Sequence, residues 1–291
     1  MSVQMLSMRA LHERARSEGA MRYASDVPFA IAPRLGTQPP ETLRFGDPLA
    51  DAGSIHECAQ HGDEYRLRQI LARGVSPDEP KTGAFEAGRT PLHVLCRGMR
   101  TIAGGRVEVG DRPACFELLR AAGANLEAVD PNGYVPLHVA CLEAEPVLAA
   151  KLIEAGVSVN VVTETGMTPL HYAAYVDMED TVTLLLKAGA AVNVKDEDGT
   201  LPLFLAVYEN RRRTIPILLR AGAVIPSTVP DWAPPDLFNT PYLQRVVAAG
   251  GFKKYEQAHI ARITKILAST PRLPLEMVRK IVEFWLHAGY Y

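Results

Sequence analysis

One short motif recurs along this chain and constrains its fold more than any other feature. Thr-Pro-Leu-His occurs at residues 90–93 and 168–171, and near-copies occur at residues 135–138 and 201–204. The intervals from His138 to His171 and from His171 to Phe204 are both 33 residues. A glycine follows each of these three positions after 18 residues, at Gly156, Gly189 and Gly222. A fixed period of this length predicts an array of structural repeats in which each unit packs on its neighbours.

Two further copies keep the pattern but carry extra residues. His93 lies 45 residues before His138, and the surplus of 12 falls in the glycine-rich stretch at residues 98–111. His56 begins a degenerate copy, with Gly74 again 18 residues later and a surplus of four before His93. The insertion at 98–111 is longer than an ordinary turn, and the sequence leaves open whether it reaches a ligand.

Local chemistry predicts two helices in each repeat. Thr90 and Thr168 are suitable N-caps, and the proline that follows each suits the first turn of a helix, where its missing N–H is not needed. The second helix has apolar residues at helical spacing, as in Val182, Leu185 and Leu186, and ends at a glycine. Because one helix pair cannot bury both of its faces, neighbouring pairs must stack.

The chain resembles the ankyrin repeat family. The match is closest at residues 165–193, where "GMTPLHYAA" precedes "LLLKAGAAVN". The resemblance implies an all-α solenoid of helix-turn-helix units with short β-turn fingers and a C-terminal helical cap. We expect five repeats, at residues 53–80 (degenerate), 86–127 (with the insertion at 98–111), 130–160, 163–193 and 196–226, after an irregular leader at 1–52 and before a helical module at 227–291.

The repeated histidines are interpreted as structural. His93, His138 and His171 recur at identical repeat positions, whereas a catalytic site needs different residues that converge on one point. We expect each to cap a helix and to tie adjacent loops together. The four cysteines occupy small or apolar repeat positions, and the cluster formed by His56, Cys58 and His61 has no second half for a metal. The motifs of phosphate loops, hydrolases and zinc proteases are absent, so we expect no catalytic residue, metal or cofactor.

The resemblance also implies a concave surface, made of the turn tips and the exposed face of the first helices, that binds a protein partner. Three tyrosines and several acidic residues lie among these positions, which favours a partner with basic character. The alternative is that exposed turns are simply polar. By position, the expected binding residues are Arg89, Arg97, Asn132, Tyr134, Leu142, Glu143, Glu164, Met167, Tyr175, Val176, Glu197, Asp198, Thr200, Tyr208 and Glu209.

The C-terminal end departs from the period. Pro274 opens a segment with apolar residues on one helical face and Lys280 and Glu283 on the other. Residues 273–285 resemble the opening helix of an F-box, which implies recruitment of a ubiquitin-ligase adaptor through Leu273, Pro274, Val278, Ile281, Val282 and Trp285. The "LPLE" at 273–276 partly fits a SOCS box, but no cysteine follows Cys141 as that family requires. The other interpretation, which we favour, is a cap over the end of the stack.

Composition narrows the classes of partner. The formal charge of -2 gives no general attraction for nucleic acid or anionic membranes, and the apolar stretches are shorter than a membrane span. We therefore expect a cytoplasmic monomer, with a nuclear location left open, that acts as a non-enzymatic protein-binding scaffold. The alternative is a substrate-recognition subunit of a cullin-type ubiquitin ligase.

Overall fold

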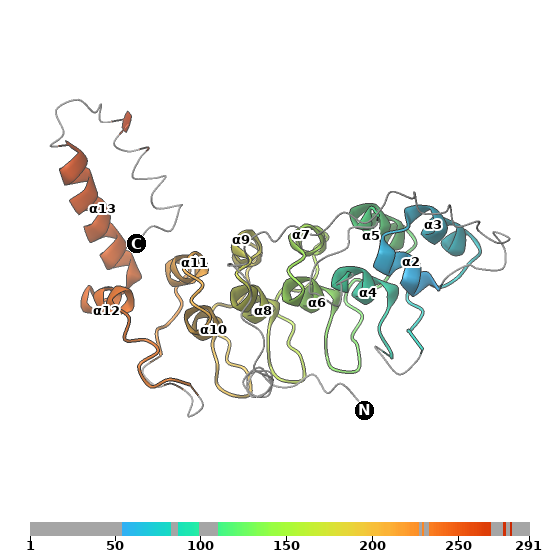
Figure 1. Ribbon diagram of the computed structural model, residues 1–291, viewed down its shortest axis with the longest axis horizontal. Coiled ribbons are helices and arrows are strands. Elements are labelled where there is room, and N and C mark those ends of the chain that lie inside the picture. The colour runs from blue at the N-terminus through green and yellow to red at the C-terminus, as the bar shows by residue number, and fades with distance from the viewer. Residues whose placement is uncertain are drawn as a thin grey trace, which may run out of the picture. The chain divides into compact units, whose positions relative to one another are not determined.

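The computed structural model describes residues 54–82, 87–98, 110–226, 229, 233–268, 276, 277 and 280. The chain divides into two units, Met1–Ser54 and Ile55–Tyr291, and the described residues after Ser54 belong to the second. All regular structure within the described ranges is helical (Figure 1). The helices are α2 (Ile55–His61), α3 (Glu64–Ala72), α4 (Pro91–Arg97), α5 (Arg112–Ala121), α6 (Pro136–Leu142), α7 (Pro146–Glu154), α8 (Pro169–Val176), α9 (Glu179–Lys187), α10 (Pro202–Tyr208), α11 (Thr214–Arg220), α12 (Pro241–Ala248) and α13 (Phe252–Ala268).

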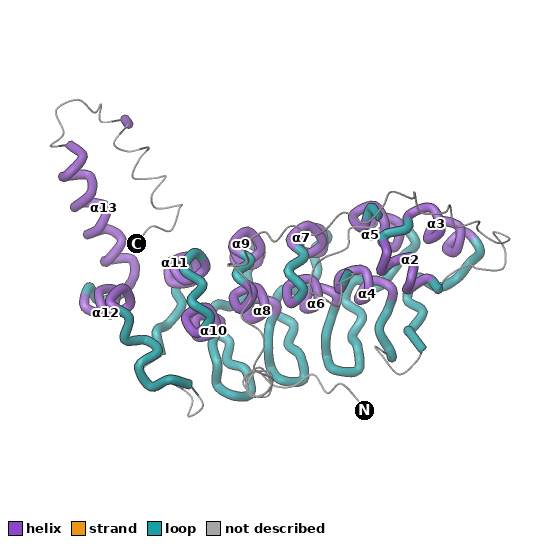
Figure 2. The backbone as a smooth tube through the Cα atoms, in the orientation of Figure 1, coloured by secondary structure: helices purple, strands orange, loops and turns teal. Residues whose placement is uncertain are grey.

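The helices from α2 to α11 form five consecutive pairs that stack side by side. The first helices α2, α4, α6, α8 and α10 make one row, and the second helices α3, α5, α7, α9 and α11 make the other (Figure 1). Each helix packs on its own partner and on the same helix of the next pair. Long loops extend from the first-helix row on one side, as Figure 2 shows in teal. This arrangement confirms the predicted all-α solenoid.

The first helices begin as the motif predicts. Pro169 lies at the first position of α8, after Thr168 in an extended conformation. The Nδ1 atom of His171 accepts hydrogen bonds from the backbone N–H of Thr168 at 3.0 Å and from its hydroxyl at 2.8 Å. The His ring therefore satisfies a backbone donor that precedes the helix, and the same contacts join Thr90 to His93.

The fingers between repeats are β-turns, as predicted. In the third finger the N–H of Gly133 donates to the carbonyl of Asp130 at 3.0 Å, and the N–H of Asp130 donates to the carbonyl of Tyr134 at 2.8 Å. Gly133 has a φ of 78°, and a Cβ there would lie 2.7 Å from the backbone nitrogen of Glu164 in the next finger. Only glycine fits both the left-handed conformation and this close approach.

The core runs along the stack between the two helix rows. One leucine recurs on each first helix from α4 to α10 and one on each second helix from α5 to α11, each at most 1% exposed. They are Leu92, Leu137, Leu170 and Leu203 on the first helices and Leu119, Leu152, Leu185 and Leu218 on the second. Complete burial of one leucine side chain contributes about 1.5–3 kcal/mol before conformational entropy is subtracted. The core therefore grows by the same increment with every repeat, and each repeat depends on its neighbours for stability.

Two kinds of contact between repeats change at the fifth repeat. Asn160 and Asn193 each donate to a glycine carbonyl in the next repeat and accept from an N–H there, but Pro226 stands at the next such position. Phe204 replaces the repeated histidine, and its ring packs against Phe238 at 5.8 Å. Phe204 thus makes an aromatic contact at the position where the earlier repeats have a histidine that forms hydrogen bonds. The helices α12 and α13 then pack on each other, and α13 also packs on α11.

Candidate partner-binding surface

The surface predicted to bind a partner is formed by the fingers and by the carboxyl-terminal ends of the first helices, and we call it the finger-side surface. Hydrogen bonds fix successive fingers to one another: the N–H of Glu197 donates to the carbonyl of Thr165 at 3.1 Å. Because each finger is held by its neighbour and by the helix below, the surface is preorganised for binding.

The repeated histidines hold this surface together. The Nε2 atoms of His93, His138 and His171 lie 2.9, 3.1 and 3.2 Å from the carbonyl oxygens of Tyr134, Val161 and Thr200, which lie in the next repeat or just before it. Since Nδ1 accepts from the N–H before the helix, Nε2 carries the proton and donates. His56 makes the equivalent contact to Arg89 at 3.1 Å. The structural interpretation of the motif is thereby confirmed, because both ring nitrogens of His93, His138 and His171 form hydrogen bonds within the fold.

Burial makes these histidines poor bases. Removal from water lowers the pKa of His138 and His171 to about 4, and it also lowers the pKa of His56 and His93. Their rings are neutral at physiological pH. They are suited to hydrogen bonding within the fold rather than to proton transfer with a substrate.

Arg89 does not lie on the exposed surface as predicted. Its side chain is 7% exposed, and its Nε donates to Oδ2 of the buried Asp130 at 2.9 Å. The other carboxylate oxygen of Asp130 accepts from the N–H groups of Asn132 and Tyr134. The guanidinium therefore joins the second repeat to the third finger and is unavailable to a partner.

Three more predicted residues are buried, so their expected exposure is wrong. Tyr134 is 5% exposed, and its hydroxyl lies 2.7 Å from that of Tyr172. Met167 and Thr200 are 2% and 1% exposed. All three stand at the repeat position of Arg89, immediately before the residue that caps the first helix. At this position Arg89 and Tyr134 point into the junction with the next repeat, where they contact Asp130 and Tyr172.

The other predicted residues are accessible. Arg97, Glu164, Glu197 and Asp198 are exposed, while Asn132, Leu142, Glu143, Tyr175, Val176, Tyr208 and Glu209 are half-buried. Tyr175 and Tyr208 lie at equivalent positions of α8 and α10, which pack together, and the Tyr208 ring stacks on Phe204 at 6.1 Å. The structure thus leaves two half-buried tyrosines on neighbouring helices and acidic side chains on the fourth and fifth fingers.

The base of the fifth finger contains a carboxylate with altered acidity. Burial raises the pKa of Asp196 to about 6, and the nearby charge of Asp198 acts in the same direction. Met167 occupies the position from which Arg89 would pair with this carboxylate. Asp196 still accepts from the N–H of Thr200 at 2.7 Å. The negative charge at this end of the surface therefore depends on pH.

Two exposed valines at the fingers were not predicted from the sequence to contribute to the surface. Val129 and Val162 lie 33 residues apart, directly before the turns of the third and fourth fingers, and are 65% and 52% exposed. The sequence feature that could have indicated them is an apolar residue directly before each polar turn. These valines add apolar area close to the acidic finger tips.

Other sequence candidates have structural roles. Arg211 donates to the carbonyl of Tyr175 at 2.8 Å, and Arg213 lies 3.8 Å from Glu179, so the arginine run at 211–213 links the fourth and fifth repeats. The four cysteines are buried free thiols whose pKa values are raised by desolvation. This confirms their interpretation as small core residues.

Several predictions concern residues outside the described part of the chain. They are the leader at 1–52, most of the insertion at 98–111, and the adaptor-binding residues Leu273, Pro274, Val278, Ile281, Val282 and Trp285. Within the described residues, there is no group of three or more His, Cys, Asp or Glu side chains that could hold a metal ion. Among the helices described, none has the length and apolar character that a membrane span requires.

Comparison with known proteins agrees with this architecture. The family described as ankyrin repeats (3 copies) matches residues 106–196 and 148–228, which together include α5 to α11. The match supports an ankyrin-repeat solenoid and does not include an F-box or SOCS box. No curated protein matches the chain.

Proposed function

We propose that this protein is a non-enzymatic scaffold that holds a basic protein partner on its finger-side surface. The observation that carries the proposal is the placement of Glu164, Glu197 and Asp198, all exposed at the tips of neighbouring fingers. Lys195 lies beside them and only partly offsets their charge. Complementary charge at such a rim speeds association and selects against acidic partners.

The rest of the finger-side surface suits protein recognition. Tyr175 and Tyr208 offer aromatic area at low entropic cost, and Val129 and Val162 add apolar area. Hydrogen bonds between fingers restrict rearrangement, so little free energy is lost in ordering the surface on binding. Ankyrin repeats generally bind proteins, which agrees with this arrangement.

Charge reversal at the finger tips tests the proposal. The purified chain and a Glu164→Lys, Glu197→Lys, Asp198→Lys variant are immobilised, and proteins retained from extracts of the native host are compared by quantitative mass spectrometry. We expect a basic protein to be retained by the wild-type chain and lost from the variant. With that protein purified, the Kd should rise by about tenfold or more, and raised salt should weaken the wild-type complex.

A matched control places positive charge on the opposite helix row. Glu154 and Asp180 are exposed on α7 and α9, away from the fingers. The variant Glu154→Lys, Asp180→Lys changes the net charge in the same direction, through two substitutions rather than three. Binding should survive this change. Equal loss in both variants would mean that overall charge rather than the finger-side surface governs retention.

The ubiquitin-ligase alternative gains no support from the described residues, and it forms no part of the proposal. Its residues lie in the C-terminal segment, and the same extract experiment with a chain truncated after Ser269 tests it. Retention of a cullin-ligase adaptor by the intact chain, and not by the truncated chain, would support that alternative.

A further inference from the structure

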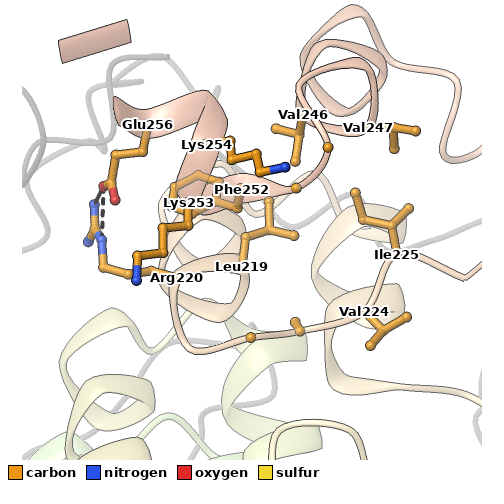
Figure 3. Close-up of a pocket in the computed structure, with 14 residues that line it drawn as sticks. Leu219, Arg220, Val224, Ile225, Val246, Val247, Phe252, Lys253, Lys254 and Glu256 are labelled. Carbon is orange, nitrogen blue, oxygen red and sulfur yellow. Dashed lines mark hydrogen bonds and ion pairs between the residues drawn. The ribbon is translucent and has the colours of Figure 1, made fainter. Parts of the chain in front are cut away.

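A pocket with apolar walls lies at the C-terminal end of the repeat stack. It has a volume of about 860 Å³ and is lined by residues of α11, of the segment after it, of α12 and of the start of α13. The volume is within the range of about 300–1,000 Å³ that is usual for sites of small ligands. Fourteen residues line it (Figure 3), fewer than the roughly 20–30 that each side of a stable protein interface contributes. The pocket therefore suits a small molecule better than a protein surface.

The walls include apolar side chains at positions where earlier repeats have polar or small ones. Val224 is 58% exposed, whereas the equivalent positions of earlier repeats hold Asn125, Ser158 and Ala191. Val247 on α12 is 59% exposed. An apolar group that binds here removes surface of both valines from water, which favours association.

Contacts between the helices hold the walls in place. Arg220 forms an ion pair with Glu256 at 2.6 Å, which joins α11 to α13. The ring of Tyr242 packs on that of Tyr255 at 5.8 Å, which joins α12 to α13. Because these contacts form the walls before a ligand arrives, little free energy is lost in ordering them on binding.

Two lysines give the pocket a positive charge. Lys253 and Lys254 line it and are exposed, and within the described part of the chain neither forms an ion pair with an acidic side chain. Of the described lining residues only Glu256 is acidic, and it pairs with Arg220. The ammonium nitrogen of Lys254 lies 3.5 Å from the place that a Cβ of Gly250 would occupy, in the turn between α12 and α13. An anionic group can therefore bind the lysines without breaking an existing ion pair.

The charge and the exposed apolar area lie at different ends of the pocket. Figure 3 shows Val224, Ile225 and Val247 on one side of the view and Lys253 on the other, with Lys254 between them. This separation matches a molecule with an apolar chain and one anionic end.

We propose that this pocket binds a fatty acid or another single aliphatic chain with one anionic end. The chain lies against Val224, Ile225 and Val247, where it displaces water from apolar surface. The anionic end accepts hydrogen bonds from the ammonium groups of Lys253 and Lys254. The inference is independent of the finger-side surface, because no residue of the fingers is among those that line the pocket.

Titration calorimetry of the full-length chain with decanoate tests the inference. We expect saturable binding of one decanoate per chain. Octanoate should bind roughly tenfold more weakly, because it has two methylene groups fewer to bury. Decyltrimethylammonium, which has the same chain with a cationic end, should bind at least tenfold more weakly than decanoate, by about the same order. Uptake of decanoate without saturation, or equal affinity for the cationic molecule, overturns the inference.

One pair of variants tests the apolar walls. Val224→Glu, Val247→Glu should abolish decanoate binding, because carboxylates then replace apolar surface. The matched control, Val129→Glu, Val162→Glu, changes exposed valines of the fingers and should leave the Kd unchanged. All four valines are exposed, so both variants should fold, which circular dichroism checks. An unchanged Kd in the first variant, or equal loss in both, contradicts the proposed site.

A second pair of variants tests the positive charge. Lys253→Gln, Lys254→Gln should raise the Kd of decanoate by about fivefold and leave the binding of uncharged decan-1-ol unaltered. The matched control, Lys187→Gln, Lys195→Gln, removes the same charge from exposed positions on α9 and the fifth finger and should affect neither ligand. If the two lysine variants bind decanoate alike, Lys253 and Lys254 do not hold its anionic end and the inference is wrong.

Two further results would assign the pocket to another occupant and overturn the inference. Decanoate that binds a chain truncated after Ser269, but not the intact chain, would mean that the chain itself fills the pocket. A dimer in sedimentation that Val224→Glu, Val247→Glu dissociates would mean that a second copy does.

Discussion

The buried, repeated histidines predict that this protein loses stability as the pH falls below neutrality. His138 and His171 are completely buried, and burial lowers their pKa from the ordinary 6.5 to about 4. The unfolded chain therefore binds more protons than the folded chain between these values. The stabilisation by each histidine is fully present above pH 6.5 and is lost progressively as the pH falls toward 4.

The magnitude follows from the two pKa values. At about 1.36 kcal/mol per pH unit, the fall of the pKa from 6.5 to about 4 corresponds to roughly 3 kcal/mol for each histidine. Two such residues account for about 6 kcal/mol, comparable with the total stability of many domains. Asp196, with its raised pKa, acts in the opposite sense because the folded state holds its proton more firmly as the pH falls below 6.

The substitution His171→Phe isolates one histidine, and Phe204 shows that the stack accepts this residue at the same repeat position. The comparison uses urea unfolding at a series of pH values from 4.5 to 7.5, chosen to span about the interval of titration. Near pH 7.5 the variant should be less stable by about 1–3 kcal/mol, because the N–H of Thr168 and the carbonyl of Thr200 lose a partner.

As the pH falls, the wild type should lose more stability than the variant. Their slopes should differ by up to about 1.36 kcal/mol per pH unit, the effect of one proton, and the two curves should converge. Asp196 is present in both chains, so its contribution cancels to first order. Parallel curves across this interval would refute the reasoning, because His171 would then titrate alike in the folded and unfolded states.

Two ion-pair predictions follow from the finger junctions. Arg89→Met should destabilise the chain by about 3–5 kcal/mol in urea unfolding, because it leaves the buried Asp130 without its guanidinium. Adding Asp130→Asn should recover part of this loss, and a single-variant loss below about 1 kcal/mol would place the pair among weak surface ion pairs. Met167→Arg should pair with Asp196 in the same geometry and lower its pKa from about 6, as followed by carboxyl NMR titration. An unchanged pKa would show that the fifth finger does not admit the guanidinium.

The sequence predicted the repeat architecture because its signals are local and periodic. Thr168, Pro169 and His171 specify the start of a helix within four residues, and Gly189 marks an end. The spacing of 33 residues then places every unit in the stack. The role of His171 in tying repeats together followed from the same periodicity.

The burial of individual finger residues could not be predicted from this periodicity. Arg89 is buried because Asp130, 41 residues later, accepts its guanidinium, and Tyr134 because Tyr172 meets its hydroxyl. Both contacts depend on how one repeat packs on the next, which periodicity does not specify. The pocket lined by Val224 and Val247 was not predicted for a similar reason, since the segment after α11 and the helix α12 come together only in the folded chain.

Hydrogen–deuterium exchange on the purified complex tests the central claim most directly. With the partner identified by the finger-tip experiment, exchange is compared in the free and bound chain. The finger-side account predicts slower exchange on binding in the fingers at residues 129–134, 162–167 and 195–200, with little change in the second helices α7 and α9. Protection confined to α7 and α9, with the fingers unchanged, would contradict it.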